Sequence, residues 1–164
     1  MTSGFHSRLT THDSRPVTSI RVRDFRPEDL EAAYELDQAC FEPGIAYSRS
    51  EIRGFLSRAG AVALAAENGG ALAGFAIGHR RGARGHIVTI DIAQGSRRRG
   101  TGRLLLTELL HRLGEAGARQ IRLEVDARNA AAIRFYEQMG FRATRRLADY
   151  YGEGIDGLEM ITDF

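Results

Sequence analysis

The chain has 164 residues, of which 43% are hydrophobic and 27% are charged, a composition typical of one soluble globular domain with its own core. All 23 residues of the Lys+Arg class are arginine, and the net charge of only +2 does not predict a nucleic-acid-binding surface over the whole protein. No apolar run approaches the roughly 18 residues of a membrane span. The single cysteine and five scattered histidines predict neither an intrachain disulfide nor a metal site.

The N-terminal segment over residues 1–18 is polar and lacks the hydrophobic stretch of a signal peptide. We therefore expect a disordered leader over 1–18, a single domain over 19–164 and a cytoplasmic protein. Ile20 and Val22 alternate with polar residues as in a strand. Pro27 then begins a helix, with acidic residues beside the positive end of its dipole.

Apolar residues at helical spacing continue this helix to Phe41, and they include Cys40. We expect Cys40 to be a buried structural thiol rather than a nucleophile. Ser48 is a candidate N-cap for a second, short helix that ends at Leu56. Residues 61–81 then predict a hairpin around an Asn-Gly-Gly turn.

The second half of the chain alternates strands and helices. Residues 85–93 are rich in β-branched side chains and predict a strand. Leucines at helical spacing predict a helix over 101–117. A strand over 119–127, a helix over 128–140 and a final pair of strands within 141–164 complete an α/β (α+β) pattern without a repeat or a linker.

Residues 96–105, SRRRGTGRLL, place three arginines before a Gly-x-Gly at the start of the predicted helix. A helix N-terminus favours anions, because its free N–H groups and its dipole both attract negative charge. Arginine adds charge-assisted hydrogen bonds to phosphate. The stretch is neither a Walker A loop, which requires lysine, nor a dinucleotide fingerprint, since Leu105 replaces the third glycine. Alone, it is also compatible with a solvated surface run.

After the strand HIVTIDIA, the run RRRGTG resembles the acyl-CoA pyrophosphate loop of the GCN5-related N-acetyltransferase (GNAT) superfamily. The resemblance implies a central, mixed, mostly antiparallel seven-stranded sheet flanked by about four helices, with acetyl-CoA as co-substrate and no metal. It assigns cofactor contacts to Arg97, Arg98, Arg99, Gly100, Thr101 and Gly102.

Three further stretches narrow the resemblance. LEVDARNAAAIRFYEQMGF over 123–141, together with RGHIVTIDI and DYYGEGIDGLEM, is similar to the N-terminal protein acetyltransferases, in particular the ribosomal-protein-alanine group and its archaeal relatives. The similarity extends over residues 20–162.

Acetyl transfer from a thioester to an amine requires a neutral amine and a proton for the departing thiolate. The resemblance implies Glu124 as general base and Tyr136 as general acid, and His86 matches a histidine that shares the base role in archaeal and eukaryotic relatives. Strand alternation places Glu124 opposite its apolar neighbours. From the residues alone, Glu124 also fits an exposed glutamate beside Arg122, and Tyr136 also fits the apolar core stripe of its helix.

The remaining cofactor contacts follow from the same resemblance. Ile90, Asp91 and Ile92 match the strand whose backbone pairs with the acetyl and pantetheine amides, although Asp91 replaces a small apolar residue. Asn129 matches a cofactor-contacting asparagine and is equally a candidate helix N-cap.

Substrate contacts are implied for Tyr150 and Tyr151, which match a tyrosine pair in the last hairpin loop, and for Tyr47. Ile155 and Gly157 depart from the usual Glu-Asp-Ala of that loop, and the FEPGIAYS segment departs as well. Both departures lie at the expected peptide site, so the substrate's own sequence stays open.

We therefore expect an enzyme that acetylates the N-terminal α-amine of a protein, with a ribosomal protein as a candidate substrate. A small-amine acetyltransferase, acting on a polyamine or an antibiotic, would instead have a deep acidic pocket. A non-catalytic acyl-CoA-binding module would keep the arginine–glycine run without needing Glu124 and Tyr136. The low net charge opposes a nucleic-acid binder. We expect no nucleic-acid or membrane partner and a monomer or weak dimer.

Overall fold

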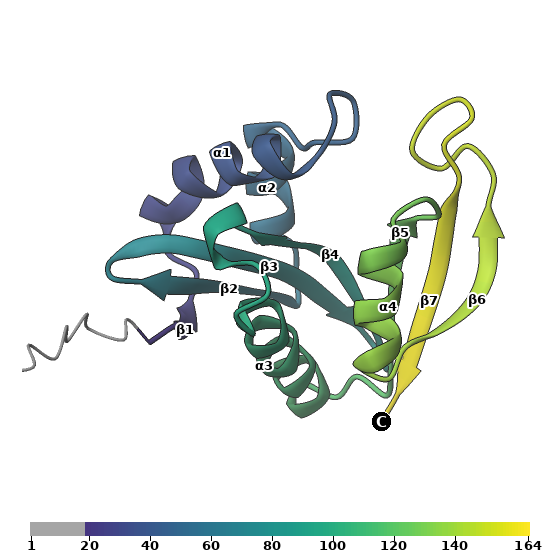
Figure 1. Cartoon of the computed structure of the whole chain (residues 1–164). Helices are drawn as coiled ribbons and strands as arrows, with labels where there is room; N and C mark the ends of the chain where they lie inside the picture. Colours follow the sequence, from purple (N-terminus) through teal and green to yellow (C-terminus); the bar gives the residue numbers. More distant parts are fainter. Residues whose placement is uncertain (1–18) are drawn as a thin grey trace, which may run out of the picture.

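The computed structural model describes residues 19–164, and the expected leader over 1–18 lies outside the described residues. This part of the chain forms one seven-stranded sheet with four α-helices and two short 3-10 turns (Figure 1). The strands are β1 (Arg21–Asp24), β2 (Ala61–Asn68), β3 (Ala71–Arg81), β4 (Arg84–Ile92), β5 (Gln120–Asp126), β6 (Arg142–Leu147) and β7 (Gly157–Asp163). The helices are α1 (Leu30–Cys40), α2 (Arg49–Leu56), α3 (Thr101–Glu115) and α4 (Ala130–Gln138), and the 3-10 turns are Pro27–Asp29 and Gln94–Ser96. None of these helices is long and apolar enough to cross a membrane.

The sheet has the strand order β1-β2-β3-β4-β5-β7-β6. Of its neighbouring pairs, β4 and β5 run parallel and the others run antiparallel. The expected mixed, mostly antiparallel seven-stranded sheet is therefore confirmed. The β2–β3 turn lies at Gly69 and Gly70, whose φ angles of 59° and 83° suit the predicted tight hairpin turn.

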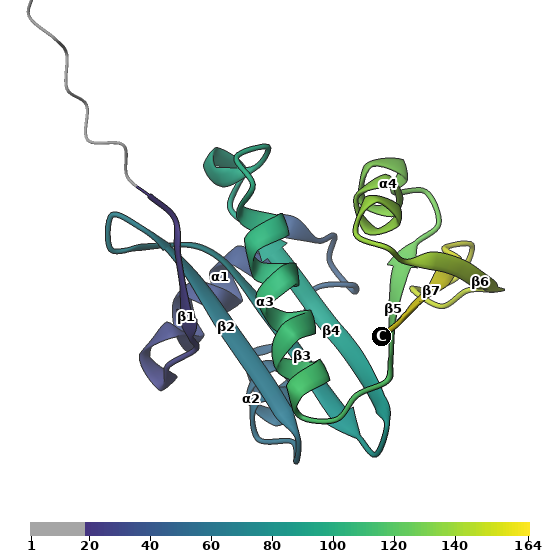
Figure 2. The ribbon, with the colours of Figure 1, turned by 90° about the horizontal axis from the view of Figure 1, so that it is seen from below.

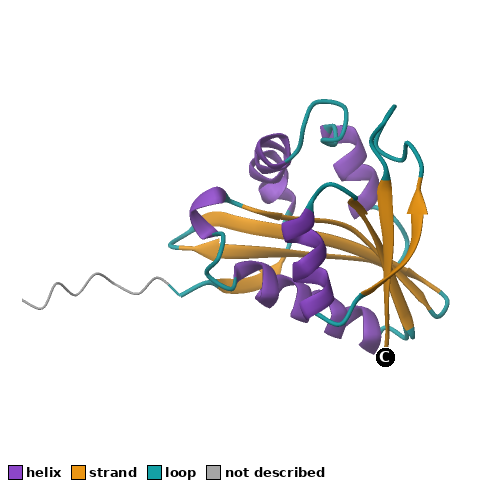
Figure 3. Ribbon diagram, turned by 45° about the vertical axis from the view of Figure 1, so that its right-hand side comes forward, coloured by secondary structure: helices purple, strands orange, loops and turns teal. Residues whose placement is uncertain are grey.

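Strand alternation in β3 divides the hydrophobic interior into two cores. Phe75 and Ile77 pack with Ala33 of α1 and Ile52 of α2, whereas Ala76 belongs to the core built around α3. Figures 1 and 2 show α1 and α2 over one face of the sheet and α3 along the other. Figure 3 shows the sheet between these helical layers.

Helix α3 approaches β3 closely because two residues that face it are glycines. A Cβ atom on Gly78 would lie 3.2 Å from Cδ1 of Leu113 and 3.3 Å from Cδ1 of Leu109. A Cβ atom on Gly74 would lie 2.7 Å from the carbonyl oxygen of Asp91 and 3.1 Å from Cδ1 of Leu105. The leucine stripe that the spacing predicted is therefore the centre of the larger core.

We expect Leu109→Ala to destabilise the protein by about 2–5 kcal/mol, because a fully buried leucine leaves a cavity when it is truncated. Leu104→Ala on the same helix is the matched control. Leu104 is 47% exposed, so its truncation should change the free energy of unfolding by less than about 0.5 kcal/mol. Urea unfolding of both variants measures the difference, and equal losses would contradict this packing of α3.

Several element boundaries differ from the sequence prediction by a few residues, and two of the differences have a clear physical reason. Residues 27–29 form a 3-10 turn before α1, and Asp29 accepts hydrogen bonds there from the Arg26 N–H at 2.7 Å and from the Arg23 guanidinium at 2.7 and 2.8 Å. The pKa of Asp29 lies below its usual value, chiefly because of the hydrogen bond from Arg23. At the other end of the chain, β6, the first of the two expected final strands, already ends at Leu147.

The early end of β6 follows from a turn in the backbone. Asp149 adopts a φ of 51°, a left-handed conformation that interrupts an extended strand. Tyr150 and Tyr151 consequently lie in the β6–β7 loop, where the resemblance placed them.

Candidate active site

The candidate site lies where strands β4 and β5 part. They pair only over residues 84–86 and 120–122, although β4 continues to Ile92 and β5 to Asp126. Strand β4 also has a bulge at Val88 in its pairing with β3, and a bulge bends a strand away from its regular course. The two strands therefore diverge beyond their short paired segment (Figure 1).

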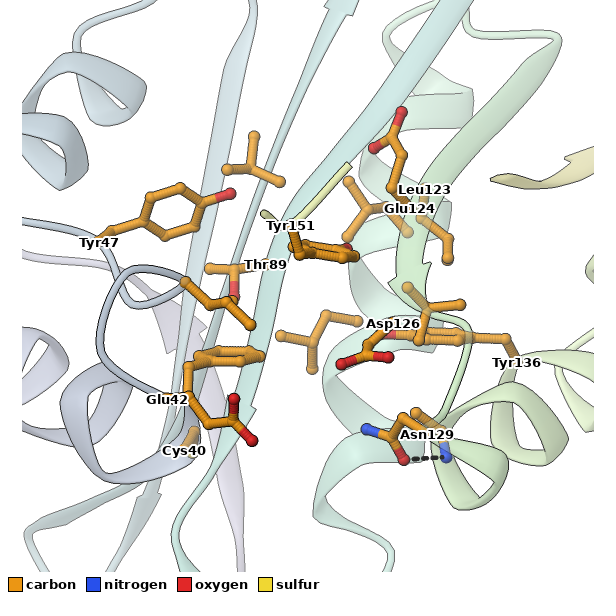
Figure 4. Close-up of a pocket in the computed structure, with 17 residues that line it drawn as sticks. Cys40, Glu42, Tyr47, Thr89, Leu123, Glu124, Asp126, Asn129, Tyr136 and Tyr151 are labelled. Atoms are coloured by element: carbon orange, nitrogen blue, oxygen red, sulfur yellow. Dashed lines mark hydrogen bonds between the residues drawn. The ribbon is translucent and has the colours of Figure 1, made fainter. Parts of the chain in front are cut away.

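A cavity of about 290 Å³ lies in this opening. Its walls come from the loop after α1, from β4 and β5, from α4 and from the β6–β7 loop (Figure 4). The residues predicted for the site that line it are Tyr47, Ile90, Glu124, Asn129, Tyr136 and Tyr151.

Glu124 contacts two other polar side chains of the site. Its side chain is 7% exposed, its Oε2 atom lies 2.6 Å from Nε2 of His86, and its Oε1 atom accepts a hydrogen bond of 2.5 Å from Arg122. The paired residues 86 and 122 end the parallel ladder, so both partners sit at the point where the cavity begins. The structure brings together Glu124 and His86, and it shows that the Arg122 pairing considered from sequence occurs in the same cluster.

Tyr136 lies on α4, where its ring packs edge-on against Phe141 with centroids 5.8 Å apart. It contacts the larger core and lines the cavity as well, so the two roles considered from sequence are compatible. Burial raises the pKa of Tyr136 well above its usual value, and the nearby carboxyl group of Asp91 adds to the rise. The phenol therefore keeps its proton at neutral pH.

Asn129 caps α4. Its side-chain oxygen accepts a hydrogen bond of 3.1 Å from the N–H of Ala132, drawn as the dashed line in Figure 4. Because the side-chain N–H₂ group is not used by the cap, Asn129 is able to cap the helix and to face the cavity.

Three tyrosines surround the opening on the side of α1 and the β6–β7 loop. Tyr47 and Tyr151 line the cavity, and burial raises the pKa of Tyr47 to about 12. Tyr150 packs edge-on against Tyr151 with centroids 4.9 Å apart and is 49% exposed. Tyr150 does not line the cavity itself and instead extends the aromatic surface outward.

The arginine–glycine run lies between the end of β4 and the start of α3. Gly100 has a φ of 82° and precedes Thr101, the first residue of the helix, so the N–H groups of the first turn have no partner inside it. Arg98 also adopts a left-handed conformation, with a φ of 57°. Arg98 and Arg99 are exposed. This geometry is suited to an anion that lies beside the cavity.

The side chains of two residues of this run form contacts within the protein. Thr101 is buried and donates a hydrogen bond of 3.1 Å to the carbonyl oxygen of Ser96. Arg97 donates to the carbonyl oxygen of Ile92 at 3.2 Å and lies 3.6 Å from Sγ of Cys40. Both side chains stabilise the loop that Arg98 and Arg99 extend from.

The side chains of the three β4 residues predicted to contact the cofactor point to opposite faces of the sheet, because successive residues of a strand alternate. Ile90 and Ile92 pack on the larger core, on the side of α3. Asp91 points the other way and is 1% exposed. The resemblance predicts that the backbone of Asp91, not its side chain, contacts the cofactor. The side chain instead accepts a hydrogen bond from Thr89.

The prediction for Cys40 is wrong in one respect. Its thiol is free and only half-buried, and it lines the cavity, because α1 ends there and the chain turns across the opening. Burial raises the pKa of the thiol, which agrees with the expectation that Cys40 is not a nucleophile. Sequence reasoning also missed Thr89 and Asp126, which line the cavity. The sequence contained one indication for Asp126: it lies two residues after Glu124 and therefore on the same face of the strand.

Within residues 19–164 no group of three His, Cys, Asp or Glu side chains is arranged to hold a metal ion. The site instead combines an opening between two parallel strands, a helix start suited to an anion, and a carboxylate–histidine contact whose Glu124 lines the same cavity as the phenol of Tyr136. These features are compatible with an acyl-group transferase. The chain belongs to the acetyltransferase (GNAT) family, whose model matches residues 29–141.

The relatives of the chain are N-acetyltransferases. It is 33% identical over 141 residues to an uncharacterized N-acetyltransferase of Methanocaldococcus jannaschii, covering 85% of this chain and 89% of that protein. It is 34% identical over 132 residues to the ribosomal protein bS18-alanine N-acetyltransferase of Escherichia coli, covering 79% and 86%. The crystal structure of the ribosomal-protein-S18-alanine N-acetyltransferase from Escherichia coli superposes with a TM-score of 0.80 at 26% identity, covering 88% and 94%.

Proposed function

We propose that the protein acetylates the N-terminal α-amine of a protein substrate, with acetyl-CoA as the acetyl donor. The observation that carries the proposal is the contact of 2.6 Å between His86 and Glu124, because Glu124 and Tyr136 line the same cavity, whereas His86 lies behind Glu124 and does not line it. The named activity of the bS18-alanine relative supports the same kind of substrate.

The residues of the site account for both proton transfers. A peptide α-amine has a pKa of about 7.7–8.0 and is partly neutral near pH 7, so a carboxylate–imidazole pair is a sufficient base. The Glu124–His86 pair takes a proton as the amine nitrogen bonds to the acetyl carbon and the carbon–sulfur bond breaks. Tyr136 then donates its phenolic proton to the departing sulfur.

The arginine–glycine run supplies the seat for the CoA pyrophosphate in this proposal. The free N–H groups at the start of α3 and the exposed Arg98 and Arg99 are suited to two adjacent phosphates. Ile90 lies at the cavity wall on β4, and β4 leads directly into this run. A bound CoA molecule would thus extend from the helix start along the strand to the cavity.

The charges around the cavity favour a peptide over a polyamine. Glu42 and Asp126 line the cavity, but Arg128 lies 2.7 Å from Asp126 and 3.8 Å from Glu42. The carboxylate of Glu124 is paired with the guanidinium of Arg122 at 2.5 Å. A deep, uncompensated acidic pocket for a small polycation is therefore missing among the residues that the structure describes.

The test is an acetyl-CoA turnover assay with peptides that differ in their first residue. Spermidine, a peptide with an internal lysine and N-terminally blocked copies of the same peptides are run in parallel. We expect turnover with free N-terminal peptides and none with the blocked copies. Turnover confined to spermidine would favour a small-amine acetyltransferase, and tight acetyl-CoA binding without turnover would favour a non-catalytic binding module.

A further inference from the structure

Two buried carboxyl groups meet between α1 and β4, behind the wall of the cavity. Asp37 on α1 is 0% exposed and Asp91 on β4 is 1% exposed, and the two side chains lie within hydrogen-bonding reach of each other. Two buried carboxylates side by side would repel each other in a medium that solvates neither. Such a pair is stable when it shares a proton, as in other carboxyl dyads.

The hydrogen bonds around the pair agree with one shared proton. Thr89 donates from Oγ1 to Oδ1 of Asp91 at 2.6 Å, and the N–H of Tyr47 donates to Oδ2 of Asp37 at 2.6 Å. The two remaining oxygens, Oδ1 of Asp37 and Oδ2 of Asp91, have no other partner among the described residues. A proton shared by the two carboxyl groups would give a partner to oxygens that otherwise have none.

The other titratable groups that face the pair do not neutralise it. The negative charge of Glu51 on α2 adds to the rise in the pKa of Asp37. The carboxyl group of Asp91 in turn adds to the rise in the pKa values of Cys40 and Tyr136. The guanidinium of Arg97 forms hydrogen bonds with the carbonyl oxygen of Ile92 and with the Cys40 thiol. Burial raises the pKa of Asp37, and it raises that of Asp91 well above the usual value.

The pair fixes the loop that closes one side of the cavity. Tyr47 is held from α1 at both backbone groups, since Asp37 accepts from its N–H and the Gln38 amide donates to its carbonyl oxygen at 2.9 Å. The loop over 41–47 contributes Phe41, Glu42, Ile45 and Tyr47 to the cavity lining. The opposite side of the cluster is β4, which forms another wall.

We propose that Asp37 and Asp91 are positioning residues for the acetyl transfer: as a hydrogen-bonded acid pair, they fix the 41–47 loop, and with it Tyr47, against strand β4. The kinetic consequence rests on the proposed function, whereas the loop anchor itself does not. Neither residue touches the reacting atoms in this proposal.

The first test is hydrogen–deuterium exchange of the segment over 41–48 in the full chain, without substrate. Asp37→Ala removes the acceptor for the Tyr47 N–H and should speed exchange of this segment about tenfold. Asp37→Asn keeps an acceptor for Tyr47 and a donor for Asp91, so it should restore most of the protection. Glu35→Gln changes an exposed carboxylate on the same helix and should behave as the wild type.

The second test is the pH dependence of the same exchange, expressed at each pH as a protection factor, which is the intrinsic exchange rate of the unstructured peptide divided by the observed rate. A carboxyl pKa that is raised in the folded state stabilises the loop at low pH, and this stabilisation is lost as the pH rises through the raised pKa. We expect the wild-type loop to lose protection as the pH rises. Asp91→Asn removes the repulsion within the pair and offers Asp37 a side-chain N–H donor, so it should keep more of its protection than the wild type as the pH rises.

The kinetic readout separates positioning from chemistry. Asp37→Ala should raise the KM for an N-terminal peptide about tenfold and change kcat and the KM for acetyl-CoA less than about twofold. Unchanged exchange over 41–48 in Asp37→Ala, or an unchanged peptide KM despite faster exchange, would overturn the positioning role. Faster exchange in a protein whose wild type acetylates no peptide would contradict the proposed function and still support the loop anchor.

Discussion

Glu124→Gln is expected to lower kcat/KM for an N-terminal peptide about 100-fold or more at pH 7, because a neutral amide cannot take the proton of the incoming amine. The substitution keeps the shape of the side chain and a hydrogen-bond acceptor for Arg122. Acetyl-CoA binding, measured by calorimetry, should therefore stay unchanged. The measurement is the pH–rate profile of wild type and variant between pH 6 and pH 9, a range that brackets an amine pKa of about 7.7–8.0.

The loss should be largest at low pH and should shrink as the pH rises. Above the pKa of the α-amine the substrate is already neutral, so a base has less to contribute. A loss of equal size at every pH would indicate that Glu124 orients the substrate rather than removing a proton. Full activity at pH 6 would remove it from the mechanism.

A matched control for this variant lies on the neighbouring strand. Glu159 on β7 is the register partner of Glu124, and it is bound by Thr144 at 2.9 Å and by Arg145 at 3.1 Å. Glu159→Gln makes the same chemical change one strand further from the cavity. It should leave the pH–rate profile as in the wild type.

Arg98→Glu should weaken acetyl-CoA binding about 10- to 100-fold, because it replaces charge-assisted hydrogen bonds to phosphate with repulsion. Arg98 already adopts a φ of 57° and is exposed. The new side chain therefore introduces no further backbone strain, and thermal unfolding should stay unchanged. Calorimetric titration with acetyl-CoA measures the effect.

Arg21→Glu reverses the same charge on β1, at the opposite edge of the sheet from β6, and serves as the control for long-range electrostatics. Its affinity for acetyl-CoA should match the wild type at physiological salt, where charges more than about 8 Å apart are largely screened. Equal affinities in all three proteins would show that the arginine–glycine run does not seat the pyrophosphate.

The sequence alone determined the elements of this protein and their order. Gly69 and Gly70 marked the hairpin, and Gly117 and Gly140 marked the ends of helices α3 and α4, because turns and caps depend on a few adjacent residues. The leucine stripe of α3 identified the core face of that helix. The run over 96–102 identified the family, since an anion-binding helix start is also a local feature.

Only the tertiary structure decided how these elements combine into a site. The insertion of β7 between β5 and β6, and the bulge at Val88, follow from pairing between segments far apart in sequence, for which the sequence has no local signal. The parallel pairing of β4 with β5 brings His86 to Glu124 across 38 positions of the chain. The packing of α1 against β4 brings Asp37 to Asp91, so the aspartate that departs from the small apolar residue expected on this strand lies beside a second buried acid.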